Sequence, residues 1–176
     1  VFERPNAVAR GAGVGSEGPV SNIIRDITRD LGPKAMDHPS IHSMRECKCR
    51  DILLVDDIIG TGHRLRKFAN ELYRHPTIKS WHSLKHISFT AIAFARTRQG
   101  EAHVRAESRV GTFVSDRILD RGRQEWSDEQ HAAIESLCRQ YGPRTTRPRL
   151  PLGMGNAFTC LVFQHKCPNT APSILW

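Results

Sequence analysis

One loop, placed between an apolar run and a helical pattern, constrains the fold of this chain more than any other feature. The apolar run is Ile52-Leu-Leu-Val55, a continuous stretch typical of a strand buried on both faces of a parallel sheet. Asp56 and Asp57 follow at once, and Gly60-Thr-Gly62 precedes a helical pattern that begins near His63. Ligands of open α/β sheets bind beyond the carboxyl ends of the strands, so this order predicts a binding site in the loop.

Each part of this loop has a chemical use. Gly60 and Gly62 allow close approach of the backbone, Thr61 adds a hydroxyl, and the start of the next helix offers N–H groups and a favourable dipole to a phosphate. Asp56 and Asp57 suit hydrogen bonds from vicinal sugar hydroxyls, or a hydrated Mg²⁺. The alternative interpretation is a turn and helix-cap pair, in which the glycines serve only tight geometry.

Apolar periodicity elsewhere predicts strands and helices in alternation. A stripe from Val20 to Leu31 predicts a helix over 19–31 that ends at Gly32-Pro33, and Ser127 with Gln130 has the spacing of a capping box for a helix that ends near Tyr141. Strands are expected at 52–55, 86–95, 110–114 and 157–163, a helix from residue 63 or 64, and a loop over 32–50. This alternation predicts an α/β fold with a mostly parallel, Rossmann-like sheet flanked by helices.

Length and charge limit the remaining choices. The 176 residues suit a single domain, and the net charge of +8 favours anionic partners such as nucleotides, phosphorylated sugars or nucleic acid. No apolar run approaches the length of a membrane helix, so we expect no membrane association. The five cysteines, an odd number, favour a reducing cytoplasm over a secreted disulfide scaffold. Because the chain begins at Val1 and soon reaches a glycine-rich loop, we expect an N-terminal segment to precede it.

The 52–64 segment resembles the PRPP-binding signature of type I phosphoribosyltransferases, in which a hydrophobic strand is followed by Asp-Asp, two apolar residues, a small residue and Thr-Gly. The resemblance implies that Asp56 and Asp57 bind the ribose hydroxyls of PRPP, with Mg²⁺ held indirectly through the ligand or water. It implies that the loop wraps the 5-phosphate, with Ile59, Gly60, Thr61, Gly62, His63 and Arg64 as its binding residues.

Two residues depart from the signature. His63 replaces the usual Ala or Gly, and Arg64 replaces the usual Thr or Ser, whose hydroxyl helps to hold the phosphate. The charge of Arg64 offers another way to hold a phosphate. His63 either contacts the ligand or begins the helix with its side chain in solvent.

An earlier glycine loop, Gly13-Val-Gly-Ser-Glu-Gly18, comes before the first predicted helix. Its GxGxxG string lacks the preceding strand and the later acidic residue that dinucleotide binding needs. The family resemblance instead implies that Gly15, Ser16, Glu17 and Gly18 hold the pyrophosphate of PRPP through backbone amides. The alternative is a glycine-rich turn without a ligand.

The region between the first helix and the 52–55 strand is short for the catalytic lid of this family, and no base-recognition hood is identifiable. We expect the positive charges that close over the ligand to come from Lys34, Arg45, Lys48 and Arg50. The C-terminal segment 143–176 reads as an extension that packs on the core, and its sequence from Pro151 is similar to a phosphoribosyltransferase-like group of bacterial conflict and anti-phage systems. That similarity implies a defence effector with partner proteins from its operon, and it makes His165 and Asn169 site candidates, unless they only end a strand and form a turn.

The sequence leaves three functions open. The first is an enzyme that transfers a phosphoribosyl group from PRPP with Mg²⁺, and the second is a non-catalytic module that senses PRPP or a nucleotide. The third is a nucleic-acid binder, for which the Arg-rich stretches at 96–109 and 144–149 are the basis. A zinc site is a further alternative, because Cys47, Cys49, His165 and Cys167 would offer four ligands, although with closer spacings than usual.

Overall fold

The computed structural model describes residues 2–3, 17–119 and 126–176, and its centre is a parallel sheet. The strands lie in the order β1-β2-β3-β4, and each pairs with its neighbour in parallel. Their bounds are Phe2–Glu3 for β1, Asp51–Ile59 for β2, Ser88–Thr97 for β3 and Thr112–Leu119 for β4. The predicted α/β fold with a parallel sheet is therefore confirmed.

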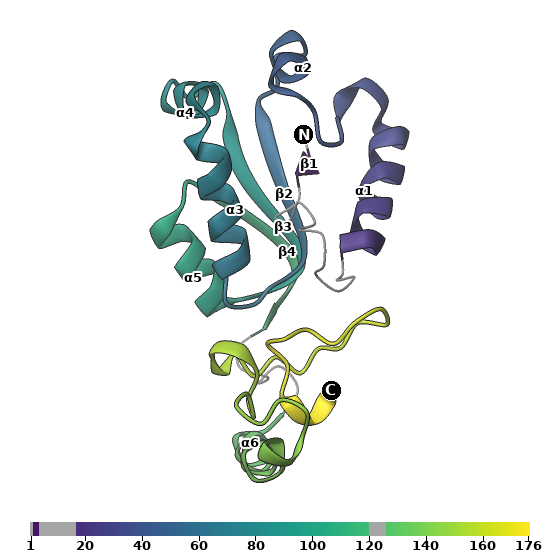
Figure 1. Ribbon diagram of the computed structural model, residues 1–176, viewed down its shortest axis with the longest axis vertical. Helices are drawn as coiled ribbons and strands as arrows, with labels where there is room; N and C mark the ends of the chain where they lie inside the picture. The colour runs from purple at the N-terminus through teal and green to yellow at the C-terminus, as the bar shows by residue number, and fades with distance from the viewer. Residues whose placement is uncertain (1, 4–16, 120–125) are drawn as a thin grey trace.

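Helices cover both faces of this sheet (Figure 1). Helix α1 (Glu17–Leu31) lies on one face, and α3 (His63–Arg74), α4 (Pro76–Ser83) and α5 (Arg98–Glu107) lie on the other. Side chains along β2 point alternately to the two faces of the sheet. Ile52 and Leu54 belong to the large core beneath α3, whereas Leu53 and Val55 pack against the smaller cluster beneath α1. Both faces of β2 are thus covered, as its continuous apolar run predicts.

The structure corrects several element boundaries. Strand β2 does not stop at Val55 but continues through the two aspartates to Ile59. The region 32–50 is not only a loop, because it holds a 3₁₀ turn, η1 (Gly32–Lys34), and a short helix, α2 (Ile41–Glu46). Ser40 explains the start of α2, since its hydroxyl accepts a hydrogen bond from the N–H of Ser43 at 3.1 Å.

The C-terminal part lies beyond the carboxyl ends of β2, β3 and β4 (Figure 1). Its helix α6 (Asp128–Tyr141) starts with the predicted capping box, in which Ser127 and Gln130 each bond the backbone of the other. Short 3₁₀ turns follow, namely η2 (Gly142–Arg144), η3 (Met154–Asn156) and η4 (Ser173–Leu175). The chain therefore returns to the sheet edge at which ligands of α/β folds bind.

The strand predicted over 157–163 is wrong. This stretch is irregular, and in it only Phe163 forms an isolated bridge, with Lys166. Ala157 and Phe158 are buried for another reason, because Phe158 packs with Cys138 of α6 and Leu152 in a separate small core, whereas Val162 is 51% exposed. Periodicity detects burial here but cannot distinguish a sheet from an irregular segment packed on a helix.

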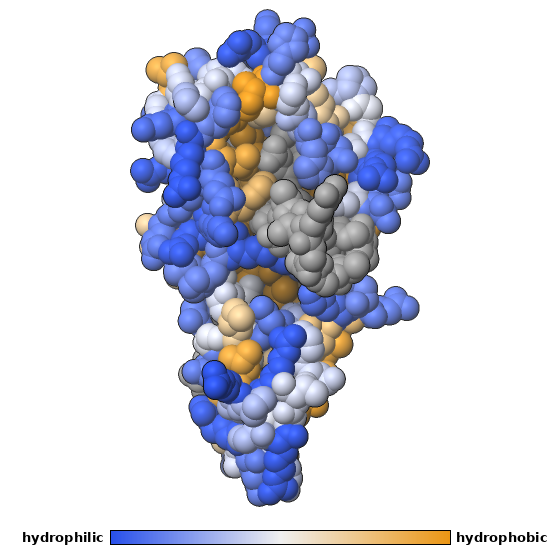
Figure 2. All heavy atoms as spheres, viewed as in Figure 1, coloured by the Kyte–Doolittle hydropathy of each residue, from blue (hydrophilic) through white to orange (hydrophobic). Residues whose placement is uncertain are grey.

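The surface in the same view is mostly hydrophilic, and the apolar side chains visible there form smaller patches (Figure 2). Among the described residues, no helix combines the length and the apolar character needed to cross a membrane.

Candidate functional site

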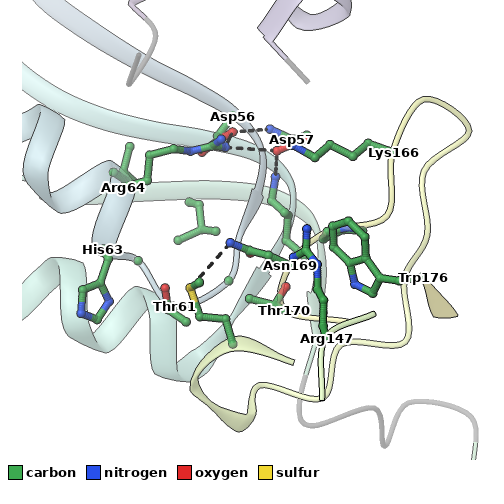
Figure 3. Close-up of a pocket in the computed structure, with 17 residues that line it drawn as sticks. Asp56, Asp57, Thr61, His63, Arg64, Arg147, Lys166, Asn169, Thr170 and Trp176 are labelled. Atoms are coloured by element: carbon green, nitrogen blue, oxygen red, sulfur yellow. Dashed lines mark hydrogen bonds and ion pairs between the residues drawn. The ribbon is translucent and has the colours of Figure 1, made fainter. Parts of the chain in front are cut away.

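A pocket of 310 Å³ lies between the loop that joins β2 to α3 and the returning C-terminal segment (Figure 3). One wall is the predicted loop with its flanks, residues 56–65. The opposite wall consists of Arg147, Met154, Lys166, Pro168, Asn169, Thr170 and Trp176. The structure thus brings the loop residues of the sequence prediction together at one cavity and adds a second wall to them.

Asp56 and Asp57 are both buried, and Arg64 pairs with them. The Arg64 side chain is 38% exposed, whereas that of Asp56 is 5% exposed. Its Nε donates to Oδ2 of Asp56 at 3.1 Å, while its Nη2 donates to Oδ1 of Asp56 and, at 3.3 Å, to Oδ1 of Asp57. The guanidinium of Arg64 therefore contacts the carboxylates at the end of β2. It does not point into the loop that the sequence predicts to bind a phosphate.

The two carboxylates also bond the backbone. Oδ1 of Asp56 accepts from the N–H of Asp57 at 2.9 Å, and Oδ1 of Asp57 accepts from the N–H of Ile58 at 2.8 Å. Burial raises the pKa of Asp56 to about 6, and the charge and hydrogen bonds of Arg64 oppose that rise. A buried carboxyl with a raised pKa beside a pocket is a feature that functional sites often share.

The loop itself presents the start of α3 to the pocket. Gly62 is the N-cap of α3 in a left-handed conformation, with a φ of 77°, and no side chain caps the helix at this described residue. The first intrahelical bond runs from the N–H of Arg66 to the carbonyl of Gly62 at 2.9 Å. The uncapped first turn and its dipole make this end of α3 suitable for an anion.

The glycines of the loop also permit close packing with distant parts of the chain. A Cβ on Gly60 would overlap the side chain of Thr170, and a Cβ on Gly100, in the first turn of α5, would overlap the carbonyl oxygen of Gly60. Thr97 holds the same carbonyl, because its Oγ1 donates to it at 2.6 Å. These glycines thus allow the backbone to pack closely against its neighbours. This packing does not fill the cavity beside the loop.

The C-terminal segment reaches the carboxylates through a short hairpin at 163–166. His165 places Nε2 at 3.6 Å from Oδ2 of Asp57, and Lys166 extends toward the two aspartates (Figure 3). Phe163 anchors the hairpin, because its ring contacts Phe94 of β3 edge-on at 5.8 Å and stacks on His165 at 5.3 Å. His165 is therefore placed beside the predicted site.

Further along the same wall, the guanidinium of Arg147 lies 3.3 Å from the centre of the Trp176 ring. The amide of Asn169 contacts the sulfur of Met154 at 3.6 Å. Sequence reasoning named Asn169 but missed Arg147, Lys166 and Trp176. No local pattern could have found them, because only the return of the chain places them opposite the loop.

Of the remaining predicted residues, His63 lines the pocket without facing the carboxylates, and others lie in α1 or outside the described part. The ring of His63 stacks on His103 of α5 at 4.4 Å and points away from the carboxylates (Figure 3). Glu17 and Gly18 belong to the first turn of α1, while Gly15 and Ser16 lie outside the described residues.

Three of the four basic residues expected to close over the site belong to the opposite end of β2. Arg45, Lys48 and Arg50 line a hollow together with Trp81 and His86. Arg50 comes directly before the first residue of β2, whereas Asp57 lies near its last. The expectation that these three residues close over the pocket is therefore wrong, because the length of the strand separates them from it.

Within the described ranges, no three or more His, Cys, Asp or Glu side chains group as a metal site would require. The proposed zinc tetrad is not assembled, because Cys47 and Cys49 precede β2 and His165 lies at its far end. The pairing of Asp56 and Asp57 with Arg64 and the backbone does not fit direct Mg²⁺ ligation, which leaves contact through a ligand or water.

Comparison with known proteins gives one match. A family model described as PRTase-CE, a phosphoribosyltransferase-like domain, matches residues 15–176. No curated protein and no solved structure shows a significant match. The matched region includes the loop, the helix that follows it and the whole C-terminal wall of the pocket.

Proposed function

The chain belongs to the PRTase-CE family of phosphoribosyltransferase-like domains, and from this premise we propose that its pocket binds PRPP or a related ribose 5-phosphate. The observation that carries the proposal is the joining of three features in one cavity. They are the two buried aspartates at the end of β2, the uncapped start of α3 and the basic C-terminal wall with Lys166 and Arg147. The aspartates suit the hydroxyls of a phosphorylated sugar, and the helix start and the basic wall suit its phosphate.

The proposed ligand lies with its ribose against the strand end and its phosphate in the loop. Asp57 accepts hydrogen bonds from the vicinal hydroxyls, and Asp56 shares this role while it remains paired with Arg64. The 5-phosphate takes backbone N–H groups from Thr61 to the first turn of α3, where the helix dipole favours its charge. Lys166, on the facing wall, supplies a cation for a further phosphate group.

We propose phosphoribosyl transfer as the reaction. The bond from C1 of the ribose to the pyrophosphate oxygen breaks, and a bond from C1 to the acceptor forms. The protein contributes position and charge, since none of the described pocket residues is placed as a covalent nucleophile. Mg²⁺ carried by the pyrophosphate would neutralise that leaving group when bound. A role as a bacterial defence effector is part of the proposal through the C-terminal resemblance.

One observation favours a second function, a sensor that binds the ligand without transfer. Arg64 lies on the carboxylates at the position where the resemblance expects a phosphate-binding hydroxyl. Arg45, Lys48 and Arg50 line a hollow at the far end of β2, so these three residues do not contribute to a lid of the kind that excludes water during transfer.

Two measurements on the same protein separate these functions. Thermal unfolding followed with PRPP, ribose 5-phosphate and ribose tests binding, because a ligand that binds only the folded state raises Tm. We expect the phosphorylated sugars, and not ribose, to raise it. Pyrophosphate release with a panel of bases and nucleosides then tests transfer, and a raised Tm without release supports the sensor. No change in Tm with either phosphorylated sugar would contradict both functions.

A further inference from the structure

The guanidinium of Arg64 occupies the electrostatic position that a divalent cation would take at a pair of carboxylates. It contacts both oxygens of Asp56 and one oxygen of Asp57 from a single planar group. A two-pronged contact of this kind is the geometry in which Arg recognises a carboxylate most strongly. The residue stands where the resemblance expects Thr or Ser, neither of which would bring a positive charge.

We propose that Arg64 is the built-in counter-cation of Asp56 and Asp57, so that the site binds a ribose 5-phosphate without a divalent cation. The inference rests on the proposed function, because it concerns the same site. Its chemical basis is that a guanidinium stays charged at any physiological pH and needs no ion from solution. A diphosphate ligand still carries its own Mg²⁺, but a monophosphate needs none.

Because Asp56 is buried and paired with Arg64, a divalent cation cannot easily replace Arg64 at these carboxylates. Asp56 is 7% exposed, so removal of its partner would leave a carboxylate with little access to water. The backbone fixes the partner as well, because Arg64 is in the first turn of α3, between left-handed Gly62 and the buried Leu65. A metal ion at these oxygens would have to displace a group that the helix holds in place.

Isothermal titration with ribose 5-phosphate tests the inference directly. The wild-type protein should bind with the same affinity in EDTA and in Mg²⁺. Arg64→Ser should bind about tenfold or more weakly in EDTA and recover in Mg²⁺, because the ion then takes the vacated position. Arg64→Lys should remain independent of Mg²⁺, and Arg66→Ser, which removes a pair with Glu107 two residues further along α3, should behave as the wild type.

A wild-type affinity that falls about tenfold in EDTA would overturn the inference. Binding of Mn²⁺, followed by electron paramagnetic resonance, tests the counter-cation role of Arg64 separately from the proposed binding of a sugar phosphate. If ribose 5-phosphate fails to bind under any condition, the proposed function fails, but Arg64 is still tested. Binding of Mn²⁺ by folded Arg64→Ser and not by the wild type supports the counter-cation. Equal binding by both, or by neither, contradicts it.

Discussion

At the scale of single residues, the site depends on charges held away from water. Asp56 keeps a carboxylate in a buried position because Arg64 and the N–H of Asp57 bond it. Asp57 lies between this pair and His165 of the C-terminal hairpin. Each of these side chains is therefore placed by its partners, and a change in one alters the charge balance of the others.

The pKa of Asp56 predicts how stability depends on pH. Burial raises this pKa from its ordinary 3.8 to about 6, so between these values the folded protein holds a proton that the unfolded chain has lost. The free energy of unfolding should therefore decrease as pH rises through this range, and the penalty should stay in full above it.

Urea denaturation at several pH values measures this dependence. Asp56→Asn should flatten it, because the amide does not titrate. A slope that is the same in the wild type and in Asp56→Asn would refute the assignment to this carboxyl.

Lys166 gives a second test at this scale. Lys166 lines the C-terminal wall, where we propose that it contacts the pyrophosphate, so Lys166→Ala should weaken PRPP binding by about three- to tenfold and ribose 5-phosphate binding less. Lys67→Ala is the control, because that side chain is 77% exposed on α3 and does not line the pocket. Equal losses for both ligands, or an equal loss in the control, would remove Lys166 from the pyrophosphate contact.

At the scale of elements, the loop after β2 is held by its neighbours. Gly100 in the first turn of α5 lies directly against the backbone of the loop, and a Cβ there would approach the carbonyl of Ile59 to 2.7 Å. Gly100→Ala should therefore destabilise the fold by about 1–3 kcal/mol, since backbone must move.

Chemical denaturation measures the effect of Gly100→Ala, and Gly111→Ala provides the control, because a Cβ at Gly111 meets nothing within 4 Å. The same displacement should weaken binding of ribose 5-phosphate in Gly100→Ala, because Gly60 belongs to the proposed phosphate loop. Unchanged stability in Gly100→Ala would mean that the loop is not held as described.

The elements also show what the sequence could predict. The continuous apolar run Ile52–Val55 predicted β2, and the spacing of Ser127 and Gln130 predicted α6, because both signals are local. Helix α5 escaped prediction, although Thr97 caps it through the N–H of Gly100 at 2.8 Å. Its Arg-rich sequence has only a short apolar stripe, so tertiary packing rather than local pattern decides its structure.

One wall of the site could be predicted from the sequence and the other could not. The loop 56–64 was readable because its residues are adjacent and their order has a chemical meaning. The facing wall was not, since Arg147 and Trp176 reach the pocket only after the chain has passed through α6 and returned. A single sequence records neither that return nor the pairing of Arg64 with Asp56 and Asp57.

At the scale of the whole molecule, the net charge of +8 allows a nucleic-acid partner as well. Basic side chains do gather away from the pocket, where Arg50, Lys85 and Arg109 line a hollow at the amino ends of β2 and β3. If the pocket is specific for a sugar phosphate, an unlabelled oligonucleotide should not displace ribose 5-phosphate in a competition titration. Displacement that persists at high salt would instead support a nucleic-acid function at the pocket.

The carboxyl end of β2 and the C-terminal part line one cavity. The sheet places Asp56 and Asp57 at the carboxyl end of β2, and the C-terminal wall faces them across the cavity (Figure 3). Neither part has the complete set of contacts for a phosphorylated ribose. The central claim is therefore that this cavity, in the folded chain, recognises such a ligand.

Calorimetric titration of PRPP in Mg²⁺ tests this claim most directly. The account predicts saturable binding at one site in the wild-type chain, a loss of about tenfold or more in Asp57→Asn, and unchanged affinity in Asp51→Asn. Circular dichroism of each variant shows that it is folded. No binding by the folded wild-type chain, or equal affinity in the wild type and in Asp57→Asn, would contradict the account.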